Sequence, residues 1–351
     1  MKLVKTILRI LLGILIFVVA AAVVLFAVLT VTEYKPADRV AASVAENGNK
    51  AQFSGDTVKL MTFNIGYAGL SDNADFFMDG GKEVQATEHD RVLQNMEEIA
   101  AFAESVGADF TLLQEVDELS TRTYRENEAE YFRNTLGQNS AYTYNYKTLF
   151  VPFPLPPIGR VTSGIETLSP YLLEDAERVK LPCPFSWPVS TANLKRCLLV
   201  TRTPIEGSDR ELVIVNLHLE AYDDGEGKIA QTKMLLSVLR EEYEKGNYVI
   251  AGGDFNQTFP HALERYPMQD PDLWTPGTLE EDALDEGWSY AYDLETPTCR
   301  LLDAPLSENS QRYVIDGFIL SPNLELISVE TQNLNFHASD HNPVVMTVKM
   351  K

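Results

Sequence analysis

The stretch Ser339-Asp340-His341-Asn342-Pro343-Val344 indicates the fold more specifically than any other segment of this chain of 351 residues. An aspartate and a histidine stand side by side here, directly before the apolar segment 344–348, which has the composition of a strand. Taken alone, the stretch is compatible with a functional site and also with a polar turn that leads into a strand.

Polar residues occur at five other places where an apolar, strand-like segment ends. Polar side chains at strand ends can converge on one cleft. Singly, each position is weak, since a lone glutamate is more often a surface residue, a lone histidine is more often structural, and Gly-Asp-x-Asn is also a turn composition. The five places are Asn64 after Met61-Thr62-Phe63, Glu115 in Leu112–Val116, His218 in Val215–Leu219, Asp254 and Asn256 in Gly252–Asn256, and Asp316 in Tyr313–Phe318.

The pattern around these positions predicts an α/β domain. A capping box, Thr87-x-x-Asp90, predicts the start of a helix that reaches Val106, and the short apolar run 110–113 predicts a strand that ends at Gln114-Glu115. A second predicted helix has Ile229, Leu235, Leu236, Leu239 and Tyr243 on its apolar face and ends at Gly246. Further strands are predicted at 58–65, 211–219, 248–251, 313–320 and 344–348.

In this order, the six motifs resemble the signature of the endonuclease/exonuclease/phosphatase (DNase I-like) family, over roughly Thr57 to Lys349. The resemblance implies a four-layered α/β sandwich of two mainly antiparallel sheets flanked by helices. The chain then divides into an anchor at 1–34, a polar linker without periodicity at 35–56, and a catalytic domain at 57–351.

The resemblance also implies a metal site. Glu115 would be the principal ligand of Mg²⁺, with Asn64 and Asp340 near the ion. Carboxylate and amide oxygens without a thiolate suit Mg²⁺ and also Mn²⁺. No spacing of cysteine, histidine and aspartate indicates a tetrahedral zinc site.

Catalytic roles follow from the same resemblance. Asp254 and Asn256 would position the attacking water and the scissile phosphate, and His218 would donate to the phosphate or assist the leaving group. His341 would act as general base or transition-state stabiliser, held by Asp316 in a carboxylate–histidine pair. Whether Asp254 or His341 takes the proton stays open.

Two details bear on the subfamily. Asn216-Leu217-His218-Leu219 is more similar to the DNase I and sphingomyelinase branches than to the abasic-site endonucleases. The segment 163–170 departs from the family's usual Gly-x-Ala-Ile-Leu-Ser-Arg strand, so its substrate contacts, Glu166 included, are not assigned.

The N-terminus predicts a membrane anchor. The segment 10–31 has 22 residues without a charge, and a helix of that length, at about 1.5 Å per residue, spans a bilayer. Lys2, Lys5 and Arg9 precede it, which places the N-terminus in the cytoplasm and the remainder outside. A cleaved signal peptide is the alternative, but no small-residue cleavage site follows closely.

Charge and cysteine content limit the function. The chain carries −22, and because the first 34 residues sum to +2, the remainder carries −24. Such a surface repels polyanions, although bound cations can offset this locally. Three cysteines are too few for a disulfide framework, and a Cys183–Cys197 bridge is left open. The proline-rich loop 150–160 is a substrate rim, a lip that dips towards lipid, or a loop packed over the sandwich edge.

We therefore expect a membrane-anchored, metal-dependent phosphodiesterase of the cell membrane, acting on a phospholipid or sphingolipid headgroup. The alternatives are a nuclease for DNA or RNA, a hydrolase of other phosphoesters, and a non-catalytic binding domain tethered to the membrane. The expected partners are the bilayer, through the N-terminal helix, and the phosphoester substrate; the sequence indicates no protein partner.

Overall fold

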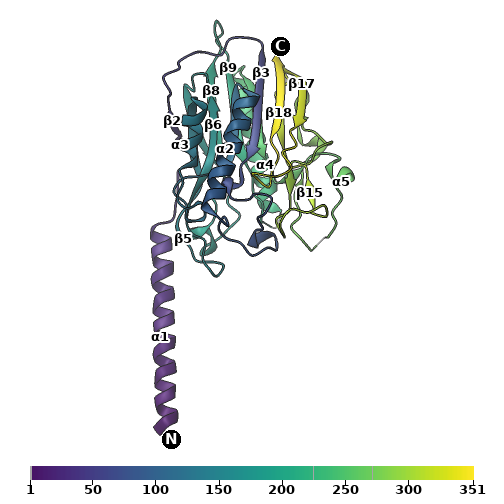
Figure 1. Ribbon diagram of the computed structural model, residues 1–351. Coiled ribbons are helices and arrows are strands. Elements are labelled where there is room, and N and C mark those ends of the chain that lie inside the picture. Colours follow the sequence, from purple (N-terminus) through teal and green to yellow (C-terminus); the bar gives the residue numbers. More distant parts are fainter. Residues whose placement is uncertain (1, 224, 271) are drawn as a thin grey trace.

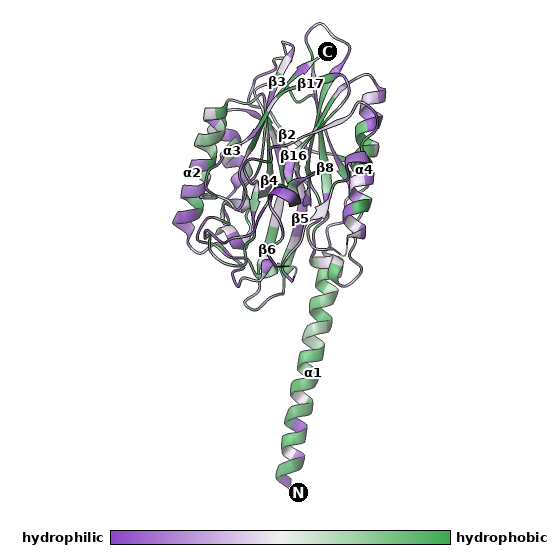
Figure 2. Cartoon of the chain, turned by 90° about the vertical axis from the view of Figure 1, so that its right-hand side faces the viewer, coloured by the Kyte–Doolittle hydropathy of each residue, from purple (hydrophilic) through white to green (hydrophobic). Residues whose placement is uncertain are grey.

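The computed structural model describes residues 2–223, 225–270 and 272–351. Within these residues, two seven-stranded sheets lie face to face, with helices on both outer surfaces (Figure 1). In Figure 2 helices α2 (His89–Val106) and α3 (Glu128–Leu136) cover one side, and α4 (Glu226–Glu244) covers the other. This is the predicted four-layered sandwich, so the fold prediction is confirmed.

Each sheet contains one central parallel pair, while its other neighbouring strands are antiparallel. The first sheet has the order β17 (Leu324–Thr331), β18 (Val344–Met350), β3 (Thr57–Asn64), β4 (Phe110–Asp117), β6 (Gly159–Ser169), β5 (Asn139–Val151), β2 (Ser43–Ala45). The second has the order β1 (Arg39–Ala41), β7 (Asp175–Lys180), β8 (Cys197–Pro204), β9 (Glu211–His218), β10 (Tyr248–Asp254), β16 (Asp316–Leu320), β13 (Ser289–Ala291).

Short elements complete the described chain. Two small ladders pair β11 (Gln257–Thr258) with β12 (Gly277–Thr278), and β14 (Cys299–Arg300) with β15 (Arg312–Tyr313). The remaining helices are α1 (Lys2–Val31), the single turn α5 (Ala262–Arg265), and the 3-10 turns η1 (Gly66–Ala68), η2 (Phe77–Asp79), η3 (Thr121–Thr123), η4 (Val189–Ala192) and η5 (Glu281–Ala283).

The two sheets meet in an apolar core, and the alternation of side chains along each strand determines which layer a residue joins. In β10, Ile250 points between the sheets, while Val249 and Ala251 pack towards α4. Phe318 and Leu112 fill the same inter-sheet layer from β16 and β4. Burial of each such side chain contributes about 1.5–3 kcal/mol, so the central strands are firmly held and their ends can carry polar groups.

Helix α1 projects from the domain, at the end opposite to the C-terminus (Figures 1 and 2). It is long and apolar enough to cross a membrane, and most of its side chains are exposed. Its last turn contacts the domain, where Leu29 is buried. The position of α1 is therefore defined by contacts of its C-terminal end alone.

The segment 35–56, which the sequence predicts to be a polar linker, contains two short strands. Strand β1 pairs with β7 and β2 pairs with β5, so this segment adds an edge strand to each sheet, and Phe53 is buried in the core between them. The sequence did not reveal this because edge pairing uses backbone hydrogen bonds and requires no side-chain periodicity.

Several predicted element ends are also corrected. The predicted capping box does not form: Glu88 is the N-cap of α2, without a side-chain bond, and the hydroxyl of Thr87 donates to Glu83 instead. Strand β4 continues beyond Gln114-Glu115 to Asp117, and the predicted strand 313–320 is interrupted between Tyr313 and Asp316.

The apolar face predicted for the helix now called α4 is wrong at Ile229, which is exposed. Lys228 and Gln231 are buried in its place, because the Nζ of Lys228 donates to the carbonyl of Ala221 and the side chain of Gln231 bonds Glu220 and Pro182. The three cysteines are free thiols, so the bridge between Cys183 and Cys197 does not form.

Candidate active site

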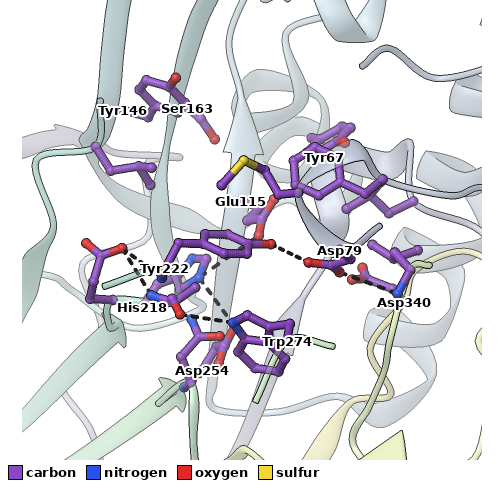
Figure 3. A pocket seen from close by; sticks show the side chains of 18 of the residues that line it. Tyr67, Asp79, Glu115, Tyr146, Ser163, His218, Tyr222, Asp254, Trp274 and Asp340 are labelled. Carbon is purple, nitrogen blue, oxygen red and sulfur yellow. Dashed lines mark hydrogen bonds and ion pairs between the residues drawn. The ribbon is translucent and has the colours of Figure 1, made fainter. Parts of the chain in front are cut away.

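Strand pairing brings the predicted residues together. Strands β3 and β4 are parallel neighbours, which places Asn64 and Glu115 at the same edge of the first sheet. In the second sheet, Asp254 of β10 is in register with His218 of β9 on one side and with Asp316 of β16 on the other. These residues line or adjoin one cavity of about 460 Å³, and Figure 3 shows Glu115, His218 and Asp254 around it.

The geometry of β4 directs Glu115 into the cavity. The register of β4 against β6 shifts between Gln114 and Val116, so Glu115 occupies a β-bulge, with φ +56°. A bulge turns a side chain out of the regular alternation of the strand. The carboxylate of Glu115 is one quarter exposed, and its Oε1 accepts a hydrogen bond from Asn64 Nδ2 at 3.3 Å.

The Gly252-Gly253-Asp254-Phe255-Asn256 motif forms a close turn at the end of β10. A Cβ on Gly253, where φ is +152°, would lie 1.9 Å from the carbonyl oxygen of Leu217, so only glycine fits. Asp254 Oδ1 accepts from the backbone N–H of Asn256 at 2.8 Å, an Asx-type turn. Asn256 Nδ2 donates to the carbonyl of Leu219, which fixes this side chain in the cavity wall.

The Ser339–Val344 stretch closes the site from the first sheet. Ser339 Oγ donates to the carbonyl of Asn64 at 2.8 Å and accepts from the N–H of His341, so the loop is held on the end of β3. His341 Nδ1 lies 2.8 Å from Asp316 Oδ2, and both residues are buried. The predicted carboxylate–histidine pair is therefore present.

Asp254 Oδ2 lies at the centre of the group. It accepts from Asn64 Nδ2 at 3.0 Å, and it lies 3.3 Å from His218 Nε2 and 3.8 Å from His341 Nε2. Asp340 Oδ2 is 3.9 Å from His341 Nε2. The six motifs, which are far apart in the sequence, thus meet at one place.

Several acidic and basic side chains are buried in the site, and burial shifts their pKa values. Burial and the neighbouring Asp316 carboxylate together raise the pKa of Asp254 to about 7. Burial, with a contribution from Glu115, raises the pKa of Asp340 to about 7. For His341, burial opposes the charged form, but Asp316 and other nearby anions outweigh it and raise its pKa well above the usual value. Burial lowers the pKa of His218, and the positive charges of Arg196 and His341 lower it further.

The residues present fit a hard divalent cation. Glu115 and Asp340 offer carboxylate oxygens to the same cavity, and Asp254, Asp316 and His341 form a group whose ligand atoms lie within 4.8 Å of one another. Such an accumulation of buried carboxylates is unfavourable unless protons or a cation balance it. The Oδ1 of Asn64 accepts from Gly66 N–H, so in this arrangement its amide nitrogen, and not its oxygen, faces Glu115 and Asp254.

The cavity also contains residues that sequence reasoning missed. Tyr222 donates to Asp79 at 2.8 Å, and burial raises the pKa of Asp79 to about 6. Trp274 lies beside Tyr222 and donates to the carbonyl of Ala221. Figure 3 shows all three side chains around the cavity. Tyr222 follows His218 closely, which is a weak signal, but nothing in the sequence links Asp79 or Trp274 to the motifs.

Arg196 is a further missed residue. It lines the cavity and is buried, and within the described chain its Nε and Nη1 have no hydrogen-bond partner. Its nearest carboxylate is Glu220, at 3.9 Å. Buried guanidinium groups are normally hydrogen-bonded, so Arg196 is available to an anionic ligand in the cavity.

No family model matches the chain, and no curated protein matches it. Solved structures do. An endonuclease/exonuclease/phosphatase from Beutenbergia cavernae is similar with a TM-score of 0.56 and 17% identity, over 84% of this chain and 72% of that chain. One from Bacteroides vulgatus has a TM-score of 0.53 and 16% identity, over 85% of this chain and 100% of that one.

ANGEL2, described as a 2',3'-cyclic phosphatase in complex with adenosine-2',3'-vanadate, is similar with a TM-score of 0.53 and 16% identity, over 89% of this chain and 99% of that chain. At such low identity these likenesses concern the fold. The resemblance predicted from the six motifs is confirmed at that level: this chain has the endonuclease/exonuclease/phosphatase fold.

Proposed function

We propose that this protein is a membrane-anchored, divalent-metal-dependent phosphodiesterase. The observation that carries the proposal is the convergence of Glu115, Asp254, Asp340 and the Asp316–His341 pair on one cavity. Phosphoryl transfer to water needs an anion-binding centre, a held water and donors for the charge that develops. In this proposal the carboxylates would hold a cation that binds the phosphate, Asp254 and His341 would orient the water, and Arg196 and His218 would donate to the developing charge.

Glu115 and Asp340 would hold the cation, with Asn64 beside them. We propose Mg²⁺, and Mn²⁺ as the alternative, because the donors are hard oxygens. When bound, the ion polarises the phosphate and neutralises charge on its oxygens.

The chain's own groups orient the water and move protons. Asp254 Oδ2 and His341 Nε2 are 3.8 Å apart on the same wall, and either can take the proton of the attacking water. Asp316 holds the Nδ1–H of His341, which fixes the tautomer and directs Nε2 into the cavity. His218 and Arg196 are placed to donate to phosphate oxygens or to the leaving group.

We further propose that α1 spans the membrane once, with the N-terminus in the cytoplasm and the domain outside the cell. The exposed apolar surface of α1 supports this, since such a surface in water would be an aggregation liability. The basic residues Lys2, Lys5 and Arg9 at its start support the orientation.

The proposed substrate is the phosphodiester of a lipid headgroup. The net charge of −22 disfavours nucleic acid. Part of the cavity wall is apolar, with Phe77, Phe153 and Ile158 among its residues. DNA and RNA are the alternative substrates, and the structurally similar ANGEL2 is described as a 2',3'-cyclic phosphatase.

The full-length protein, reconstituted in phosphatidylcholine nanodiscs, tests the proposal. Sphingomyelin, phosphatidylinositol, DNA, RNA and bis(p-nitrophenyl) phosphate would each be offered with Mg²⁺. We expect hydrolysis of the synthetic diester and of at least one lipid, with loss of both in His341→Ala. Absence of any hydrolysis by the wild type would favour the non-catalytic binding domain.

A further inference from the structure

The end of the domain that carries the cavity is the end from which α1 departs. Strand β18 runs towards the C-terminus at the far end, and β3 runs antiparallel to it, so the end of β3 and the start of β18 lie at the end of the domain from which α1 departs (Figure 1). Asn64 ends β3, and His341 comes shortly before β18. If α1 spans a bilayer, the mouth of the cavity therefore lies close to the surface of that bilayer.

Large apolar side chains gather at this end. Of the described residues outside α1, six such side chains are more than half exposed, and five of them lie here. Solvent exposure of this kind is costly unless a partner covers it. The five are Leu149 (54%), Phe153 (68%), Leu155 (88%), Trp187 (63%) and Val189 (57%); the sixth, Ile327 (55%), is on the edge strand β17. We call Phe153, Leu155, Trp187 and Val189 the apolar rim.

Trp187 fixes the depth of the rim relative to α1. Its ring lies 6.2 Å from the ring of Phe26, and its Nε1 donates to Thr30 Oγ1 at 3.1 Å. Phe26 lies more than one turn inside the apolar stretch, which ends at Val31. A tryptophan at the level of the last turn of a membrane span occupies the interfacial aromatic belt, so Trp187 belongs to the bilayer interface and not to bulk water.

The same segment forms part of the cavity. Val189, Ala192 and Leu194 line the cavity on one side, and Phe153 and Ile158 line it on the other. Tyr146 of β5 donates to the carbonyl of Ala192, which ties the two sides together. Apolar residues therefore lead from Phe26 of α1, through Trp187, to Val189 in the cavity lining.

Positive charge lies beside this path. Lys35, Lys147 and Arg160 line a cleft where the chain leaves α1. Lys35 pairs with Glu33, whereas Lys147 and Arg160 make no ion pair within the described residues. In a chain of net charge −22, this local excess is unusual, and basic residues beside a span are attracted to anionic lipid.

We propose that the apolar rim inserts into the bilayer that α1 spans, and that a lipid-borne phosphoester passes from this bilayer into the cavity. The inference rests on the proposed function for its chemistry, but the docking itself is a separate physical claim. The apolar part of the lipid would remain between Phe153 and Val189 while the phosphate reaches Arg196 and His218. Lateral access of this kind avoids extraction of the whole lipid into water.

Fluorescence quenching tests the docking without any activity. The full-length protein would be placed in phosphatidylcholine nanodiscs with bromines on the acyl chains near the interface. We expect quenching of Trp187, assigned by its loss in Trp187→Phe. In that background, a tryptophan introduced by Leu155→Trp should also be quenched, whereas one introduced by Ile327→Trp should not. Absence of quenching at 187 or 155 would overturn the proposal.

Kinetics tests the access route. Leu155 does not line the cavity, so Leu155→Asp should leave turnover of bis(p-nitrophenyl) phosphate unchanged and lower turnover of sphingomyelin or phosphatidylinositol in the same nanodisc at least tenfold. Ile327→Asp, at an apolar site away from the rim that is also more than half exposed (55%), should change neither. Turnover of the soluble diester by the wild type without any lipid turnover contradicts the access route. No turnover of either substrate contradicts the proposed function, while the quenching experiment still decides the docking.

Discussion

Two regions of the cavity differ in what they expose and what they bury: the floor, where the aspartates and histidines of the site lie, and the apolar rim. The floor buries Asp254, Asp316 and Asp340 beside two histidines, where charge is expensive. The rim exposes Phe153 and Leu155, where apolar surface is expensive. Neither departure stabilises the isolated domain. The proposed ligands would account for both: a cation and a phosphate for the floor, and lipid for the rim.

The largest expected effect comes from the floor. Asp254→Asn and His341→Ala should each lower kcat/KM for bis(p-nitrophenyl) phosphate about 10³-fold or more, because each removes a group that can move the water's proton. Steady-state kinetics measures the loss, and thermal unfolding verifies that the fold is retained. A folded His341→Ala protein with wild-type turnover would contradict the assignment of the site.

Removal of the proposed cation should have the second-largest effect. Activity should disappear in EDTA and return with excess Mg²⁺.

Glu115→Gln should lower activity at least about 10²-fold and should raise the Mg²⁺ concentration needed for half-maximal rate, because a neutral amide binds a hard cation more weakly. Glu118→Gln, on the same segment but outside the cavity lining, serves as the matched control and should need no more Mg²⁺ than the wild type. Full activity in chelator would rule out the metal mechanism.

Asp316→Asn should have a smaller effect, on the order of 10- to 100-fold, because Asp316 acts through His341. The carboxylate raises the pKa of His341, so its removal should shift the titration of that imidazole to lower pH. NMR of the histidine ring would measure the shift. Loss of activity with an unchanged histidine pKa would indicate a merely structural role.

The smallest effect should come from Glu166, a buried carboxyl in β6 that does not line the cavity. Burial raises its pKa from about 4.5 to about 8. The folded state therefore binds the proton more tightly, and this group lowers stability progressively as pH rises from about 4.5 to about 8.

Glu166→Gln, which resembles the neutral acid, should accordingly raise the midpoint of thermal unfolding at pH 8 by a few degrees and have little effect at pH 5. Turnover at pH 7 should not change. This would separate buried acids that serve the site from one that only destabilises the fold. Equal midpoints of wild type and variant at pH 8 would show that ionised Glu166 does not destabilise the fold.

Much of the site could be predicted because its residues occur at the ends of strands with clear apolar patterns. Asn64, His218, Asp254 and His341 were found in this way. Asp79, Arg196 and Trp274 were missed, since they come from the 3-10 turn η2 and from irregular segments whose sequences carry no periodic signal. The bulge that turns Glu115 into the cavity was missed as well, because a one-residue change of register leaves no mark in composition.

The sequence by itself determined the order of six motifs, the long apolar N-terminal segment and the excess of negative charge. These are local properties, written in residue types and their spacing. Only the tertiary structure decided that 39–45 adds edge strands, that Trp187 packs on Phe26, and that the strand ends carrying the site lie at the end of the domain from which α1 departs. Such contacts join segments that are 95 residues or more apart, and they depend on how the sheets stack, which no short stretch of sequence encodes.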